Sequence, residues 1–251
     1  MKHQEEAQSP QRLEEQEEKS QEARAARVPV SRARVLQTAL ALADDTGLEA
    51  LTMRALGQAL GVQAMSLYNH VANKEALLDA MVDQVVSEIV LPSPGHPWQA
   101  EMRRRALSAH TVLMRHPWAC GLLMSRANVG PAMLRYVDAT IGCLRAAGFS
   151  LPMVDHAWNA LDSFIYGFTL QKLHFPFKAG EYAAKAAFFL PLLPAEQLPH
   201  MRAMTLAVAN RQHDGLHTLD FGLELILAGL EKLRHGEKEV ATHKTSEEDV
   251  R

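Results

Sequence analysis

The stretch GVQAMSLYNHVANKEALLDA, residues 61 to 80, concentrates side chains that can recognise another molecule. Two of them, Gln63 and Asn69, are amides, and an amide can donate to and accept from one adenine edge at the same time. Ser66 adds a hydroxyl that can bond to either kind of base edge, and Ala64 and Met65 add methyl groups for contact with thymine. No Arg or Lys is present between residues 63 and 69, so nothing there can grip guanine with two bonds.

A cation follows this stretch in an unusual position. Asn73 is a suitable N-cap residue, and Lys74 comes directly after it, at the positive end of the helix dipole. A cation there is disfavoured by about 0.3 to 1 kcal/mol, and a phosphate nearby would remove the conflict. The position of Lys74 therefore suggests a contact with a nucleic-acid backbone.

Four helices position these residues. A helix with Ser31 as N-cap ends at Gly47, and a short one begins after the cap Thr52 and ends at Gly61. A third covers Gln63 to Asn69 after a tight turn, and a fourth runs from Asn73 to about Ile89. Two short helices joined by a turn that contains glycine are typical of helix-turn-helix DNA readers.

The two short helices need tertiary support, because isolated helices below about 12 to 15 residues are marginal in water. Gly57 costs about 1 kcal/mol relative to alanine inside the second helix. Such a glycine makes sense where a second backbone passes close by, as at the crossing of the two short helices.

The run from Leu51 to Ala80 closely resembles the DNA-binding region of the tetracycline-repressor (TetR) family of bacterial transcription regulators. The resemblance is dense and ungapped, extends back to Ser31, and covers about 50 residues. It is carried by Leu51-Thr52, Arg54, Leu56, Gln58, Leu60-Gly61-Val62, Leu67-Tyr68, His70-Val71, Asn73-Lys74 and Ala76-Leu77-Leu78-Asp79-Ala80.

The resemblance implies that residues 63 to 69 form the recognition helix in the major groove, with Leu67 turned to the core. The DNA-contacting positions it implies are Thr52, Arg54, Gln63, Ala64, Met65, Ser66, Tyr68, Asn69, His70 and Lys74. Alternatives stay open for some of them: Thr52 also caps a helix, Tyr68 and His70 could be packing residues, and Arg54 could be a solvated charge. The reading residues differ from those of the tetracycline repressor, so a different operator is expected.

The net charge of the sequence does not by itself indicate a nucleic-acid-binding protein. The net charge of the 251 residues is −3, and residues 28 to 90 hold four Lys or Arg against seven Asp or Glu. Several of these acids, including Asp79, Asp83 and Glu88, fall along the fourth helix and could sit away from the duplex. Affinity would then depend on a few placed cations, with a modest salt dependence.

Composition predicts an all-α protein in four segments. Ala, Leu and Met are abundant and only 6% of residues are aromatic. We expect a disordered charged tail over 1–27, which could alternatively touch DNA, and a helix-turn-helix domain with its connecting helix over 28–90. A helical ligand-binding and dimerisation domain should follow over 91–235, and a second disordered tail over 236–251. Its helices are expected at about 97–115, 118–126, 130–147, 152–175, 195–209 and 215–234.

Two helices of the C-terminal domain carry apolar stripes. One consists of Val154, Ala157, Trp158, Leu161, Phe164, Ile165 and Phe168, and the other of Leu216, Leu219, Leu223, Ile226, Leu227, Leu230 and Leu233. Gly222, Ala228 and Gly229 would admit a close neighbour. By resemblance the pair forms a four-helix bundle in a homodimer; burial within one monomer is the alternative.

The residues that could hold a small-molecule effector are less distinct. Polar groups on the first of these helices could reach a cavity with aromatic and methionine walls. The candidates are Met114, Trp118, Tyr136, Asn159, Asp162, Ser163 and Tyr166. A solvated polar face is the alternative interpretation.

Other classes of function find little support. His213 and His217 have the spacing of a metal-ligand pair but no identifiable third ligand, so neither a metal nor another cofactor is expected. Cys120 and Cys143 form no metal motif, and signal-peptide, membrane-span and enzyme motifs are not found. We therefore expect a cytoplasmic, homodimeric regulator that binds double-stranded operator DNA, most simply a repressor released by an unidentified effector. An activator of the same family or a helical scaffold protein without DNA binding is the alternative.

Overall fold

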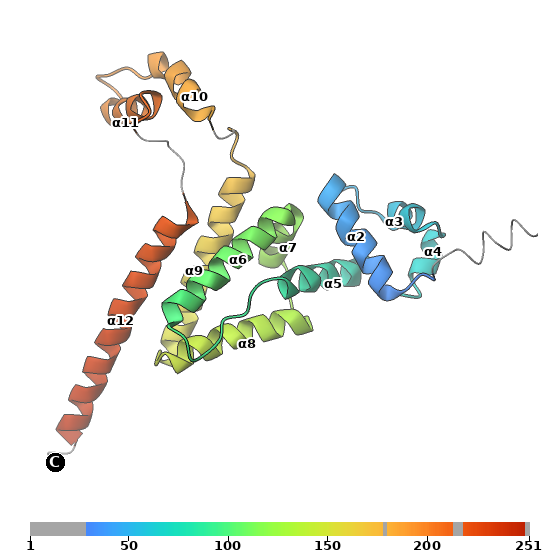
Figure 1. Ribbon diagram of the computed structural model, residues 1–251, viewed down its shortest axis with the longest axis horizontal. Helices are drawn as coiled ribbons and strands as arrows, with labels where there is room; N and C mark the ends of the chain where they lie inside the picture. Colours follow the sequence, from blue (N-terminus) through green and yellow to red (C-terminus); the bar gives the residue numbers. More distant parts are fainter. Residues whose placement is uncertain (1–28, 178–179, 213–217, 249–251) are drawn as a thin grey trace, which may run out of the picture.

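The computed structural model describes residues 29–177, 180–212 and 218–248, with side chains as far as residue 236. The regular structure in this part of the chain is helical, without strands, which confirms the all-α prediction. Figure 1 shows an elongated molecule in which the N-terminal helices form one end and the later helices form a separate body. The expected tail over 1–27 lies outside the described residues.

The N-terminal domain consists of α2 (Arg32–Thr46), α3 (Met53–Leu60), α4 (Ala64–Leu67) and α5 (Lys74–Ser87). Its predicted N-caps are present: the side chains of Ser31, Thr52 and Asn73 accept the backbone N–H groups of Arg34, Ala55 and Ala76 at 3.3, 3.0 and 2.8 Å. Gly61 ends α3 in the left-handed conformation, with φ of 70°. Local capping thus fixes where α2, α3 and α5 begin and where α3 ends.

The α3–α4 crossing depends on Gly57. A Cβ atom at this position would lie 2.9 Å from the Val62 carbonyl oxygen and 3.1 Å from the Ala64 nitrogen. Both are backbone atoms of the turn and of α4, which cannot move aside as a flexible side chain can. The structure therefore shows the close approach of a second backbone that the sequence predicted at Gly57.

A small core holds the N-terminal domain together. Leu67 from α4 is fully buried with side chains of α2, α3 and α5. Helix α5 belongs to two cores, because Leu77, Leu78 and Met81 lie in this cluster while Val82 and Val85 lie in the core of the C-terminal body. This helix therefore joins the two parts of the chain.

The C-terminal body is built from α6 (Trp98–Arg115), α7 (Pro117–Ser125), α8 (Pro131–Ala146), α9 (Leu151–Leu173) and α12 (Leu219–Glu248). The bounds of α6 to α9 are close to those expected from sequence. The apolar stripes predicted on α9 and α12 are largely used within the monomer, where Leu161 and Ile165 are buried in the same cluster as Leu223 and Leu227. Leu216 lies outside the described residues.

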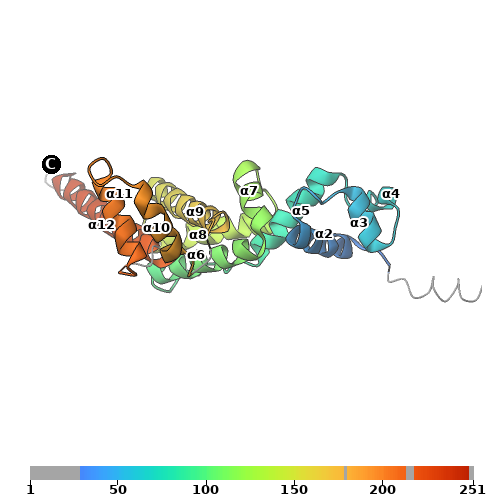
Figure 2. The ribbon, with the colours of Figure 1, turned by 90° about the horizontal axis from the view of Figure 1, so that it is seen from above.

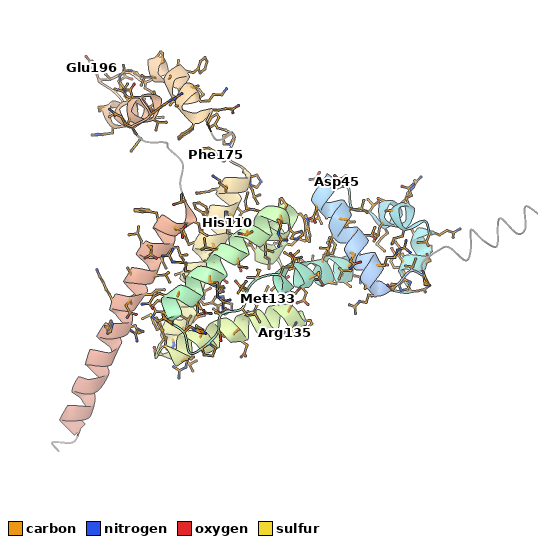
Figure 3. All side chains as sticks on the ribbon, viewed as in Figure 1. Asp45, His110, Met133, Arg135, Phe175 and Glu196 are labelled. Carbon is orange, nitrogen blue, oxygen red and sulfur yellow. The ribbon has the colours of Figure 1, made fainter. Side chains whose placement is uncertain are left out.

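A second helical unit stands apart from this body in Figure 1. It contains α10 (Tyr182–Phe189), the 3-10 turn η1 (Leu190–Leu192) and α11 (Pro199–Ala209), which pack on one another. Figure 3 shows Phe175 at the end of α9 from which this unit extends. The sequence predicted only one helix here, over 195–209, so α10 was missed.

Helix α12 is longer than expected. Its helical backbone continues to Glu248, whereas a disordered tail was expected from residue 236. The extension contains no proline and is rich in Glu and Lys, which have good helix propensity. Figure 2 shows α12 reaching the end of the molecule opposite α3 and α4.

Candidate functional site

The surface of α4 and the turn after it presents the residues predicted to read DNA. Met65 is 74% exposed and Tyr68 is 44% exposed, with Gln63 and Asn69 also exposed. Ala64, Ser66 and His70 are half-buried. The hydroxyl of Ser66 donates to the Gln63 carbonyl at 2.6 Å, which leaves its oxygen available as an acceptor.

The helix proper is shorter than the predicted span of 63 to 69. It ends at Leu67, and the backbone N–H groups of Tyr68, Asn69 and His70 each donate to the carbonyl three residues earlier. These tighter turns continue the same surface past the end of the helix. Tyr68 and Asn69 therefore remain on the exposed side although they lie outside α4.

The candidate phosphate contacts lie at the beginnings of α3 and α5. Thr52 is exposed and caps α3, and Arg54 is exposed in the first turn of that helix. Lys74 is half-buried at the first position of α5, and within the described residues it makes no ion pair. Among the described residues, no acidic side chain pairs with Lys74 to relieve its unfavourable interaction with the helix dipole.

The acidic residues of α5 are turned toward the C-terminal body. Arg126 donates to Asp79 at 2.7 and 2.9 Å and to Glu75 at 2.6 Å, and these bonds raise the pKa of Arg126. Asp83 accepts the backbone N–H groups of Ala132 and Met133 at 2.9 Å each, at the start of α8. These acids thus link α5 to the C-terminal body. They are bonded there and do not face the α4 surface, although the N-terminal domain carries a net negative charge.

A second polar contact joins α2 to the C-terminal body. Asp44, near the end of α2, accepts from the indole N–H of Trp118 at 2.7 Å and lies 2.8 Å from Nδ1 of His116. In Figure 3, Asp45 marks this end of α2 on the side of α7. Trp118, predicted as a wall of the effector cavity, is therefore placed at the contact between the two domains.

A groove of about 640 Å³ lies along the side of α5 that carries Asp79 and Asp83. It is formed by the exposed side of α2, by α5 and by the connection from α7 to α8. Its lining includes Arg32, Leu36, Asp79, Asp83, Asn128 and Val129.

The interior of the C-terminal body contains a charged cluster on α6, α8 and α9. The Arg105 guanidinium is fully buried, pairs with Asp162 and lies 4.6 Å from the centre of the Tyr136 ring. Asp162 also accepts from the indole N–H of Trp158 at 2.6 Å and from the Tyr166 hydroxyl at 3.4 Å. Three of the predicted effector residues, Tyr136, Asp162 and Tyr166, are therefore gathered in one place.

The other predicted effector residues are not part of this cluster. Met114 is 37% exposed, and Asn159 and Ser163 are exposed on another side of α9, where Asn159 bonds to Asp155. Sequence reasoning overlooked Arg105, because it stands in a run of three arginines. Its spacing was the available signal, since position 105 follows the helical period of the buried residues Trp98, Met102, Ala106 and Ala109.

One side of α9 and α12 remains uncovered in the single chain. On α9 it carries small residues, Ala160, Ser163 and Gly167, and on α12 it carries Phe221, Leu225 and Ala228. Phe221 is 72% exposed and Leu225 is 62% exposed. Contiguous exposed apolar side chains of this kind mark a surface that a partner covers.

Comparison with known proteins identifies the class to which this arrangement belongs. The family described as bacterial regulatory proteins, tetR family, matches residues 35–81, and the tetracyclin repressor-like C-terminal domain matches residues 91–234. The chain belongs to the TetR family. It is a ligand-responsive, DNA-binding transcriptional regulator of a family whose members form dimers.

Individual relatives match over most of their length. The tetracycline repressor protein class D of Escherichia coli is 31% identical over 209 residues, covering 80% of this chain and 89% of its own. The transcriptional repressor DrrR1 of Streptomyces coeruleorubidus is 29% identical, covering 81% and 79%. The crystal structure of the Streptomyces coelicolor protein ActR in complex with actinorhodin superposes with a TM-score of 0.69, at 28% identity, covering 82% of this chain and 99% of that one.

The metal ligands, membrane spans and cysteines can be checked over the described residues. No group of three potential ligands among His, Cys, Asp and Glu is placed to hold a metal ion within the described residues, but His213 and His217 lie outside them. Within that same part of the chain, no helix has the length and apolar character needed to cross a membrane. Cys120 and Cys143 are buried and not joined to each other.

Proposed function

We propose that this protein is a cytoplasmic repressor, without enzymatic activity, that leaves its operator when a small molecule binds the C-terminal body. The observation that carries the proposal is the surface of α3 and α4. Its apolar side is buried through Leu67, while Gln63, Met65, Tyr68 and Asn69 are exposed and the acids of α5 are bonded elsewhere. An exposed row of amide and apolar groups beside Arg54 and Lys74, which make no ion pair within the described residues, suits a major groove with adenine and thymine edges.

The proposed contacts fall into two kinds. Gln63, Ala64, Met65, Ser66 and Asn69 face the bases, while Thr52, Arg54, Tyr68, His70 and Lys74 position the domain on the phosphates. A homodimer presents two such surfaces and reads two half-sites related by a twofold axis. The relatives named as repressors support a repressing rather than an activating role.

The proposed switch is a linkage between the two domains. A molecule that binds one arrangement of the C-terminal body more tightly shifts the dimer toward that arrangement. If the recognition surfaces then no longer match the half-site spacing, effector and DNA weaken each other's binding by the same factor. The contacts of Asp44 and Arg126 between the domains give this coupling a physical route.

Binding to the DNA upstream of the protein's own gene tests the proposal. In a gel shift over a range of salt concentrations, Lys74→Ala should weaken binding and lower the slope of log affinity against log salt by about 2, because each protomer loses one phosphate contact. Lys185→Ala is the matched control, because it removes an equal charge from an exposed position on α10. Equal slopes for Lys74→Ala and wild type would refute the phosphate contact.

A further inference from the structure

The charged cluster inside the C-terminal body is unevenly satisfied. Arg105 uses one nitrogen to bond Asp162, but its Nε and Nη1 groups make no hydrogen bond within the described residues. The Tyr136 hydroxyl lies beside Arg105 and Tyr166 but likewise makes no bond of ordinary geometry there. Three buried polar groups are thus left without partners, which costs free energy and calls for an explanation.

Each of the three unsatisfied groups can donate a hydrogen bond, although the Tyr136 hydroxyl can also accept one, and the carboxylate oxygens of the cluster are occupied. Both oxygens of Asp162 already accept, one from Arg105 and the other from Trp158 and Tyr166. Burial raises the pKa of Tyr136 to about 12 and the pKa of Tyr166 well above its ordinary value, so both phenols keep their protons near neutral pH. Burial alone would lower the pKa of Arg105, but the electrostatic effects of Tyr136 and Asp162 are larger, so the pKa of Arg105 is raised.

The charges within the cluster already cancel. The positive charge of Arg105 faces the negative charge of Asp162, and apolar side chains such as Met102, Leu161 and Ile165 belong to the same core. A carboxylate added to this interior would be an uncompensated buried charge, which is costly. A neutral oxygen acceptor can satisfy the same donors without that cost.

We propose that this cluster is the polar end of the effector site, and that the effector offers Arg105 and Tyr136 a neutral carbonyl oxygen on an apolar body. The inference rests on the proposed function, since it assigns the chemical class of the effector to that site. Arg105 and Tyr136 are the specificity-determining donors, and Asp162 is a positioning residue that holds the guanidinium. Trp158, next to Asp162, provides a fluorescent reporter of occupancy.

Three probes of matched shape test the chemical class on the full-length protein without DNA. These are 2-acetylnaphthalene, which has a carbonyl oxygen, 2-ethylnaphthalene, which has none, and 2-naphthoate, which is an anion. Titration calorimetry should show the ketone binding at least about tenfold more tightly than either of the others. Equal binding of ketone and hydrocarbon, tightest binding of the naphthoate, or binding of none of the three would overturn the inference.

Two variants separate recognition from structural support. Tyr136→Phe removes an unpartnered hydroxyl, so it should leave the thermal midpoint unchanged or raised while weakening the ketone several-fold. Arg105→Met should abolish the preference for the ketone over the hydrocarbon. A lowered midpoint with unchanged ketone affinity in Tyr136→Phe would instead mean that the hydroxyl is satisfied by water in a structural role, and would overturn the inference.

Different results would contradict the assigned effector class and the proposed function. Wild-type protein that binds its operator but shows no preference among the probes contradicts the assigned effector class and leaves the DNA-binding proposal intact. Protein that prefers the ketone but binds no operator contradicts the proposed function.

Discussion

Gly57 is the residue on which the reading surface depends most directly. Replacing it with alanine places a methyl group against the backbone of Val62 and Ala64. We predict that Gly57→Ala destabilises the protein by about 1 to 3 kcal/mol, because an overpacked crossing must open, and that it also weakens operator binding. Chemical denaturation and gel shifts provide the measurements.

Gly121→Ala serves as the control for this substitution. A Cβ atom at Gly121 in α7 would meet nothing within 4 Å, and alanine is favoured over glycine in a helix. This variant should be as stable as wild type or more stable. If both substitutions have the same effect, the close crossing is not what requires Gly57.

The burial of some single residues could be predicted from the sequence, whereas the burial of others could not. The burial of Leu67 and the exposure of Gln63 and Asn69 were expected from the resemblance to the TetR family, and the structure agrees. The burial of Arg105 could not be recognised in the same way, because a charged side chain that directly follows two other arginines has the composition of a solvated face. Its partner Asp162 is 57 residues away, and such a pairing depends on how helices pack.

At the scale of an element, Glu231 fastens α12 to α6. Its carboxylate accepts from the Trp98 indole at 3.1 Å and from Arg234. The hydrogen bond from Arg234 has the largest effect, and together with the bond from Trp98 it lowers the pKa of Glu231 from 4.5 to about 2. A carboxyl group whose folded pKa is depressed stabilises the protein above its unfolded pKa, and this contribution is lost as pH falls toward the folded value.

We therefore predict that the stability contributed by Glu231 is complete above about pH 4.5 and disappears between there and about pH 2. Glu231→Gln should be less stable than wild type at neutral pH, and the difference should shrink over this window. Unfolding by urea at a series of pH values measures it. A difference that stays constant with pH would contradict the role of the charged carboxylate.

Helix boundaries were predictable where capping residues mark them, as at Ser31, Thr52 and Asn73. Helix α10 was not, because its eight residues stand between proline-containing segments and include two adjacent phenylalanines. So short a helix has little stability of its own and persists through its packing on α11. Such support comes from residues later in the chain and leaves no local pattern.

At the scale of the whole molecule, the exposed sides of α9 and α12 should form the dimer interface. We predict that Phe221→Glu combined with Leu225→Glu converts the dimer to a folded monomer, because two charges per protomer would be buried against a partner. The monomer should also bind the operator weakly, since it reads one half-site. Sedimentation velocity and circular dichroism measure the association state and the fold.

Glu224→Gln on the same helix is a suitable control, because its side chain is exposed and pairs with Arg103 of the same chain. It should remain dimeric. Persistence of the dimer in the double variant would place the interface elsewhere.

The central claim, that two copies of the α4 surface read DNA, is tested most directly by selecting bound sequences from random duplex DNA with the full-length protein. The account predicts one enriched site with twofold symmetry, half-sites related by turns of the duplex, and A·T pairs at positions that change when Gln63 or Asn69 is replaced by alanine. Recovery of no common sequence, or of the same sequence by these variants, would contradict it.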